Sequence, residues 1–307
     1  MNRSINERGQ VFVLTTMAMV ALVGMAALVL DVGSWFRASR RLQAAADAAA
    51  LAGAQALPAN PGGATQMAVS YGGTNGGGVA ASDVTILSTN SANDTISVDA
   101  KEQDPSFFAT VFGINLVDVT EHAEAIVGIP SQALYVAPMV VKCSHPLIQN
   151  CNGQNTPVFN QNTSLDYDKF GAPGAFGMLD LSNSNGNVGS STLGSWITNG
   201  YSQYLPLGNY DSDPGAKFSS QNVAGALNGR IGTVLLFPVF DTLNLQGSNA
   251  QYHVIGWIGF HLNSVTNLSG NTATLGGYFT SYIAQGLLPP NGNGSTNFGV
   301  KSIQLIQ

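Results

Sequence analysis

Histidine is the residue type with the widest catalytic potential in this chain, which contains His122, His145, His253 and His261. An imidazole acts as a general base or a metal ligand only where a carboxylate, a nucleophile or further ligands lie beside it. His253 and His261 flank VIGWIGF at a spacing of eight, so a regular strand would place both on one face. The sequence has no HExxH, GxSxG or P-loop motif. We therefore expect no enzyme, and we assign no catalytic or cofactor-binding residues.

Two pairs of aspartates raise the question of calcium binding. Asp166 and Asp168 lie in LDYDK, and Asp211 and Asp213 lie in YDSDPG. Carboxylates two residues apart occur where oxygen ligands surround calcium, but neither pair continues into the twelve-residue EF-hand pattern. Aspartate is also common in turns, because its side chain bonds nearby amides. The turn role is the stronger interpretation, and we assign no metal site; calcium binding stays an open alternative.

The two cysteines, Cys143 and Cys151, close a small loop in KCSHPLIQNC. This arrangement favours a disulfide formed in an oxidising compartment. Two free thiols in a cytosolic loop are the alternative. A zinc site is less well supported, because only His145 lies nearby and a structural zinc ion needs four ligands.

Composition and charge exclude one class of partner. The chain has 307 residues, of which 44% are hydrophobic and only 9% are charged. Five of the eleven basic residues fall in the first 41 positions, and from Leu42 onward six basic residues face fifteen acidic ones. An acidic body lacks the clustered lysine and arginine that bind phosphates. We therefore expect no nucleic-acid partner.

The longest apolar run, Val11 to Leu30, contains twenty residues without a charge. A helix of this length crosses about 30 Å of hydrocarbon. A secretory signal has a shorter apolar region and a small-residue cleavage site, whereas this run continues into LDVGSWFRASRR. Trp35 and Phe36 suit the headgroup zone, and Arg37, Arg40 and Arg41 could reach lipid phosphates. The run is predicted to be a retained, single-pass anchor in contact with membrane lipid.

Beyond the apolar run, the helix is expected to continue as a projecting stalk. No proline interrupts the chain until Pro58, and the segment from Arg40 to Pro58 contains nine alanines, so the helix should extend to Leu57. Its small residues follow a heptad spacing that lets another helix approach closely, namely Leu42, Ala46, Ala49, Gly53 and Ala56. We call these five positions the seam. The seam predicts packing on partner helices or between copies of the chain, and a solvated spacer is the alternative.

These segments together resemble a known family. ERGQ, a single span ending in LDVG and then RRLQAAADAAALAGA are similar to the N-terminal module of TadE/TadG-like proteins of bacterial tight-adherence (Flp) pilus assembly, over residues 7 to 57. The resemblance implies a bitopic envelope protein with a cytoplasmic N-terminus, related to minor pilins or assembly accessories. Pilins of the family are cleaved after a glycine and usually carry glutamate at the fifth mature position. Here Gly9 is followed at that position by Leu14, so we expect an unprocessed, TadG-like protein.

The rest of the chain is predicted to be an α/β unit followed by a β-rich domain. ALPANPGGA is expected to be a linker, followed by a short helix within residues 64–78, a hairpin of VTILS and TISVDAK, a helix in DPSFFATVFG and a strand in LVDVTEHAEAIVG. In the DPSFFATVFG helix, Asp104 would be the N-cap and Pro105 the first helical residue. Further on, the expected strands are ALYVAPMVV, TVLLFPVFD, YHVIGWIGFHL and ATLGGYFTSYI, with short helices in STLGSWITNG and SSQNVAGALNG.

The expected fold class is therefore α+β. It comprises an N-terminal transmembrane helix extended as a stalk (1–58), a small pilin-like α/β unit (59–130) and a larger β-rich exported domain (131–307). The expected function is that of an inner-membrane component of a Flp-type pilus assembly or secretion system, acting through helix packing and an exported domain. An anchored surface adhesin or envelope hydrolase, displayed by the same helix, is the alternative.

Overall fold

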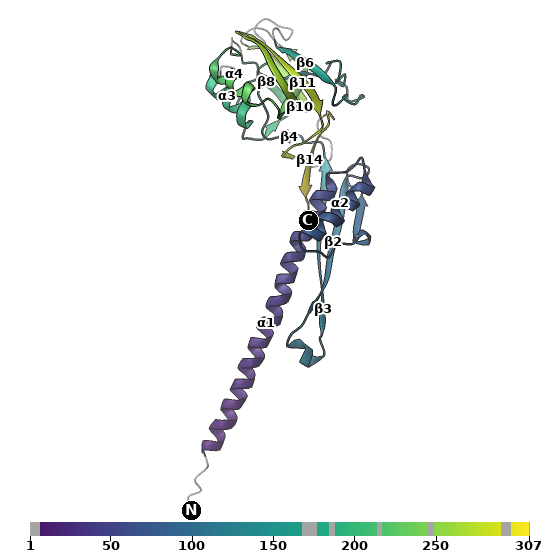
Figure 1. Cartoon of the computed structure of the whole chain (residues 1–307), viewed down its shortest axis with the longest axis vertical. Coiled ribbons are helices and arrows are strands. Elements are labelled where there is room, and N and C mark those ends of the chain that lie inside the picture. The colour runs from purple at the N-terminus through teal and green to yellow at the C-terminus, as the bar shows by residue number, and fades with distance from the viewer. Residues whose placement is uncertain are drawn as a thin grey trace, which may run out of the picture. The chain divides into compact units, whose positions relative to one another are not determined.

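The computed structural model describes residues 7–167, 177–183, 188–213, 217–244, 249–289 and 296–306. The fold is α+β, as expected, and it separates into two compact units (Figure 1). Unit 1 comprises Met1–Ile126 with Leu305–Gln307, and unit 2 comprises Val127–Gln304.

Helix α1, Glu7–Ala54, has 48 residues and is therefore about 72 Å long. It ends three residues before the expected Leu57. The amides of Gln55, Ala56 and Leu57 bond to carbonyls three residues back, so the last turn tightens. Pro58 accounts for this end, because it disfavours a helical conformation at the preceding residue and has no amide to donate.

Helix α2, Pro61–Thr74, begins within the segment that was expected to be a linker. Pro61 occupies the first turn, and the Asn60 side chain accepts a hydrogen bond from the Gly63 amide at 2.9 Å. Proline has a suitable φ for this position, and asparagine is a preferred N-cap, so Asn60-Pro61 is a helix start. The linker prediction was therefore wrong for residues 61–64, while the predicted helix is present.

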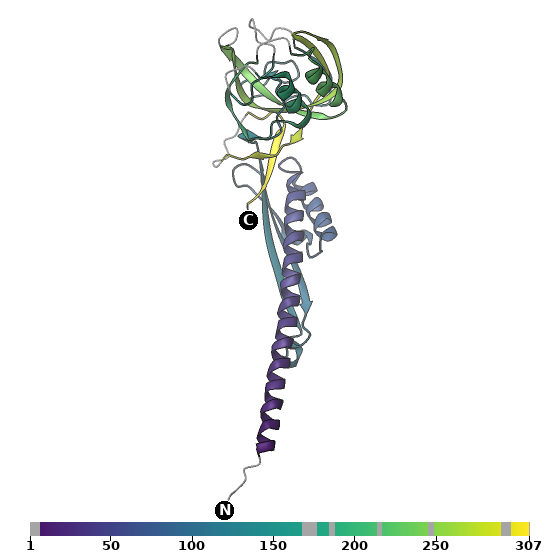
Figure 2. The same cartoon turned by 90° about the vertical axis from the view of Figure 1, so that its left-hand side faces the viewer.

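An antiparallel sheet completes unit 1. Strand β1, Val84–Leu87, pairs with β2, Thr95–Pro105, and β2 pairs with β3, Leu116–Gly128. The predicted β1–β2 hairpin is confirmed, and β3 coincides with LVDVTEHAEAIVG. The β2–β3 hairpin runs beside α1 and points towards its N-terminal half (Figures 1 and 2).

The turn between β1 and β2 is organised by one buried carboxylate, Asp94. It accepts hydrogen bonds from the amides of Thr89, Asn90 and Ser91 at 2.6–2.8 Å, and from the Thr95 hydroxyl at 3.0 Å. Burial of the Asp94 carboxyl alone would raise its pKa, but these donors outweigh burial and the pKa is lowered.

Asp94→Asn is expected to destabilise unit 1 by about 2 kcal/mol at neutral pH, because charge-assisted hydrogen bonds are lost. The folded-state pKa of Asp94 is lowered, so its stabilisation is present above the unfolded pKa of about 3.9 and is lost as pH falls through the folded pKa. Hydrogen exchange of β2 amides, measured from pH 7 downward, checks this. The difference between wild type and variant should shrink below about pH 4. A difference independent of pH would contradict the role assigned to the carboxylate charge.

The predicted helix in DPSFFATVFG was wrong. Strand β2 continues through Asp104 and Pro105, which pair with Val117 and Leu116 of β3. Only one 3-10 turn, η2 (Ala109–Phe112), forms at the end of the hairpin. We call residues 106–115 the hairpin tip. Asp104 does not act as an N-cap, because the β ladder continues through Pro105 and no helix begins there.

Unit 2 is built on a six-stranded sheet, in which β5-β9-β10-β11-β6 are neighbours and β8 also pairs with β10. The bounds are β5 Val141–Lys142, β6 Asn162–Tyr167, β8 Gly208–Asp211, β9 Val234–Asn244, β10 Gln251–Ser269 and β11 Thr272–Thr280. Helices α3, Ser190–Asn199, and α4, Gln221–Gly229, lie at the predicted positions. A smaller sheet joins β4 Gln132–Ala133, β7 Leu205–Pro206 and β13 Gly286–Leu287, and β12 Tyr282–Ile283 pairs in parallel with β14 Val300–Leu305.

Three of the four strands expected in unit 2 are present, as β9, β10 and β11. The fourth, ALYVAPMVV, is not one strand: only its ends fall in β4 and β5. Tyr135 has a φ of 58°, and Pro138 interrupts the segment, so a continuous ladder cannot form.

Candidate membrane-proximal site

The first part of α1 exposes an apolar surface that the described residues of the other elements leave almost entirely uncovered. Only 6% of its most apolar 18-residue window is buried, and Val20 and Val29 are 68% and 70% exposed. A core helix of a soluble domain would be mostly buried. The hydroxyls of Thr15 and Thr16 donate to the carbonyls of Val11 and Phe12, so their polar hydrogens are satisfied within the helix. This segment therefore has the length and composition of a single-pass membrane anchor.

Asp31, the first residue after the apolar run, binds the hairpin tip. Its side chain is buried and accepts hydrogen bonds from the amides of Phe107 (2.8 Å), Phe108 (3.0 Å) and Ala109 (2.6 Å). These amides start the η2 turn and would otherwise lack partners. Asp31 thus supplies the capping carboxylate for the start of the η2 turn, a role that was expected of Asp104 for a helix, from a position more than 70 residues away in the sequence.

Polar contacts continue along α1 beyond Asp31. The Ser34 hydroxyl donates to Asp104 at 2.9 Å, the Ser39 hydroxyl donates to Glu121, and Arg41 forms an ion pair with Glu102. Arg41 was expected to reach lipid phosphates, but its guanidinium is engaged with β2. The hairpin is therefore fixed to the helix by polar groups over several turns.

Neighbouring aromatic and basic residues remain on the outside of α1. Phe36 is exposed, and the Arg40 guanidinium lies 4.9 Å from the centre of its ring. Arg37 is exposed as well. These residues keep the composition of a membrane interface just after the apolar run.

The seam is covered by the same chain. Leu42, Ala46, Ala49 and Gly53 are buried, and α1 packs there against α2 and β2. A Cβ atom added at Gly53 would overlap Ile96 and would lie 2.9 Å from the carbonyl oxygen of Ala64. Ala56, the fifth position, lies past the end of the helix. The seam is a close-packing surface, as its composition predicted, but its partner helix is α2.

Association of copies or partner helices through the seam was therefore a wrong prediction. The physical reason is that small side chains specify a close approach without specifying which helix approaches. In this chain α2 follows α1 after a short turn and covers the seam.

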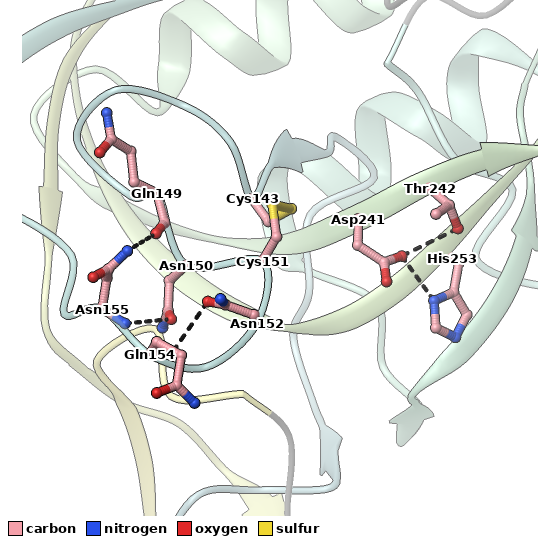
Figure 3. The surroundings of a disulfide bond; sticks show 10 residues. All are labelled: Cys143, Gln149, Asn150, Cys151, Asn152, Gln154, Asn155, Asp241, Thr242 and His253. Atoms are coloured by element: carbon pink, nitrogen blue, oxygen red, sulfur yellow. Dashed lines mark hydrogen bonds and ion pairs between the residues drawn. A yellow bond between two sulfur atoms is a disulfide. The ribbon is translucent and has the colours of Figure 1, made fainter.

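In unit 2, the predicted disulfide between Cys143 and Cys151 is present, with 4.9 Å between the Cα atoms (Figure 3). Its loop is held by the Asn150 side chain, whose oxygen accepts from the Asn155 amide at 3.0 Å. His145 lies within the same loop and packs edge-on against Phe279. Burial lowers the pKa of His145. The histidine therefore serves packing, and the cysteines are unavailable as zinc ligands.

Breaking this disulfide should lower the stability of unit 2. Closing a loop of this size stabilises a fold by about 2–3 kcal/mol, so Cys143→Ser and the double serine variant should unfold at lower denaturant concentration. Mass spectrometry of wild type should detect two thiols only after reduction. Alkylation of both cysteines before reduction would contradict the pairing.

His253 and His261 do not share a face. Tyr252 and Val254, on either side of His253, belong to one hydrophobic cluster, whereas Phe260 and Leu262, on either side of His261, belong to the other. The β10–β9 register shifts near Val254, and an extra residue in a strand inverts the alternation. The prediction of shared facing was therefore wrong.

Each histidine has a separate structural partner. His253 lies 2.8 Å from Asp241, which also accepts a hydrogen bond from Thr242 (Figure 3). His261 stacks on Tyr278 with 4.7 Å between ring centres. In unit 1, His122 lies 2.7 Å from Asp99, and its hydrogen bond is the main reason that the pKa of Asp99 is lowered.

The aspartates considered for calcium bind protein groups. Asp166 accepts from Thr274 at 2.8 Å, Asp211 accepts from Gln251 at 2.8 Å, and Asp213 pairs with Lys217 at 3.0 Å. Asp168 lies outside the described residues. Burial raises the pKa of Asp213, although Lys217 opposes this. Within the described ranges, no three histidine, cysteine or acidic side chains are grouped as metal ligands.

Comparison with known proteins supports the family resemblance of the N-terminal module. No curated protein and no solved structure matches the chain. Residues 9–56, which cover nearly all of α1 including Asp31 and the seam, match the family described as "Putative Flp pilus-assembly TadE/G-like". The match confirms that the N-terminal part of this chain is similar to TadE/G-like Flp pilus-assembly proteins.

Proposed function

We propose that this protein is a single-pass inner-membrane component of a Flp-type pilus assembly or secretion system, with a structural rather than enzymatic role. In this proposal the N-terminus is cytoplasmic, α1 crosses the membrane, and residues 42–307 are exported. The observation that carries the proposal is the coincidence of the family match, residues 9–56, with a helix whose first part is apolar and uncovered.

Two further observations support export of the body. The Cys143–Cys151 disulfide is typical of an oxidising compartment. Beyond Leu42 the chain is acidic and poor in lysine, so it has few of the positive charges that favour cytoplasmic retention. We propose that residues 1–58 anchor the protein, that residues 59–130 form a membrane-proximal pilin-like part with α1, and that residues 131–307 make contacts outside the membrane.

The partners proposed are membrane lipid and other pilus-assembly or pilin components. Since the seam is occupied by α2, contacts with other helices would use the exposed surface of residues 11–30. An exported adhesin or hydrolase carried by the same anchor is the competing function.

Deletion of the gene in its host separates these functions. An assembly component predicts loss of pilin from the sheared surface fraction and loss of adherence, with both restored by the wild-type gene. A displayed adhesin predicts normal surface pilin with adherence lost. A reporter fused to the C-terminus that is active only in the cytoplasm would contradict the proposed topology.

A further inference from the structure

The hairpin tip is an exposed apolar surface that the fold of unit 1 does not explain. Its sequence, SFFATVFGIN, has no charged residue, and Phe107, Val111 and Phe112 are 66%, 82% and 84% exposed. These side chains are gathered at one end of a long hairpin. An exposed cluster of this kind indicates an interaction surface.

The contact with Asp31 fixes the level of the hairpin tip along α1. Asp31 directly follows the twenty-residue apolar run, which rises about 30 Å along the helix axis and matches the hydrocarbon thickness. Because the amides of Phe107, Phe108 and Ala109 bond to Asp31, the hairpin tip lies level with the C-terminal end of the apolar run, which is where the hydrocarbon ends in the proposed anchoring. The exposed side chains of Val29 and Leu30 continue this apolar surface on the helix.

The backbone of the hairpin tip is suited to a layer of low polarity, where unpaired amides are costly. The amide of Ser106 bonds to the Asn115 carbonyl, and the Thr110 hydroxyl bonds to the Phe107 carbonyl. The amides of Val111, Gly113 and Ile114 bond to carbonyls within the hairpin tip. With the three amides bound by Asp31, most of the polar backbone here has an internal partner.

Charge marks the limit of the apolar surface. On the two strands, the first charged residues after the hairpin tip are Asp104 and Asp118. Asp104 accepts from Ser34, and Asp118 accepts from Gln103 at 2.9 Å. Carboxylates are unfavourable inside hydrocarbon, so the hairpin could enter only as far as its uncharged end.

We propose that the hairpin tip inserts its phenylalanine and valine side chains into the lipid interface beside α1, as a second membrane contact of unit 1. A single spanning helix leaves the attached unit free to tilt with the helix relative to the bilayer normal. A second contact with lipid beside the helix restricts this tilt and holds unit 1 at a defined height and inclination to the membrane surface. The inference rests on the membrane anchoring in the proposed function, and it does not depend on pilus assembly.

Spin labels on the full-length protein in lipid nanodiscs test the insertion. Four variants each carry one added cysteine. Two replace Val111 and Phe112 in the hairpin tip, one replaces Thr120 in β3, and one replaces Ala92 in the β1–β2 turn. The native cysteines remain paired. Accessibility is measured to oxygen, which concentrates in lipid, and to a water-soluble nickel complex. Labels at Val111 and Phe112 should be severalfold less accessible to nickel and more accessible to oxygen than the label at Ala92, with Thr120 close to Ala92.

Equal nickel accessibility at Phe112 and Ala92 would overturn the proposal. Protection of Phe112 that occurs only in nanodiscs holding two or more copies would also overturn it, because a second copy would then be the occupant. A label at Leu22 reports separately on the span. If Leu22 is in lipid and Phe112 is in water, insertion fails while anchoring stands; if Leu22 is in water, the anchoring itself fails.

Discussion

Substitution of Gly53 by leucine is expected to unfold the packed part of unit 1. The position is buried between α1, α2 and β2, and even one added carbon overlaps Ile96 and approaches the Ala64 carbonyl at 2.9 Å. The isoleucine tip can move, but the carbonyl belongs to the backbone of α2 and cannot move without shifting that helix. Overpacking of this kind costs about 3 kcal/mol or more for leucine, a large part of the stability of a small unit.

Gly53→Ala provides a graded version of the same experiment. Alanine is the better helix former by about 0.5–1 kcal/mol, so propensity alone predicts stabilisation. Gly33→Ala, in the same helix, is the matched control, because a Cβ atom there has nothing within 4 Å. We expect Gly33→Ala to be neutral or slightly stabilising and Gly53→Ala to be destabilising.

Hydrogen exchange of β2 peptides in the full-length protein measures this effect without interference from unit 2. Protection should fall in the order Gly33→Ala, Gly53→Ala, Gly53→Leu. If Gly53→Leu leaves β2 protected and instead weakens association between copies of the protein, the seam faces another chain and the packing described here is wrong.

The seam illustrates what sequence patterns can and cannot specify. The spacing of Leu42, Ala46, Ala49 and Gly53 correctly indicated a surface made for close helix packing. It could not identify α2 as the partner, because small side chains fit any approaching backbone. Asn60-Pro61 is the local signal for the start of α2, but proline and the glycines that follow it also suit a linker.

Asp31 shows a different limit of prediction from sequence patterns. The apolar run and its length were readable from hydropathy, since they depend on local composition. The role of Asp31 depends on amides that lie more than 70 residues away, and no local pattern around LDVG records them. Similarly, Asp104-Pro105 has the local signature of a helix start, but pairing with β3 determined the outcome. Local signals were reliable where neighbours in sequence are neighbours in space, as in the β1–β2 hairpin and the disulfide loop.

The two ends of the α1 contact surface therefore have different chemistry. At Gly53 the helix is held by close apolar packing, which tolerates no added volume. At Asp31 it is held by a buried carboxylate that accepts hydrogen bonds from three amides at the end of the apolar run. The contact at Asp31 is the one that positions the hairpin tip along α1.

Loss of the Asp31 carboxylate is therefore expected to release the hairpin tip without unfolding unit 1. In Asp31→Ala the amides of Phe107, Phe108 and Ala109 lose their acceptor, so their exchange should accelerate by at least about tenfold, while β1 and β2 near Ile96 remain protected. Asp31→Asn retains one acceptor oxygen but presents an amide group to backbone donors, so partial release is expected. Asp47→Ala in the same helix is the control, since Asp47 accepts from Gln43 one turn away and not from the hairpin tip.

The measurement is hydrogen exchange of a peptide covering residues 106–115, made on the full-length protein in detergent micelles and compared across the three variants. Release in Asp31→Ala with Asp47→Ala unchanged would establish that the carboxylate tethers the hairpin tip. Unchanged protection in Asp31→Ala would mean that the β2–β3 ladder alone orders the hairpin tip. The level of the hairpin tip along α1 would then not be fixed by Asp31, and its proposed placement at the lipid interface would lose its principal support.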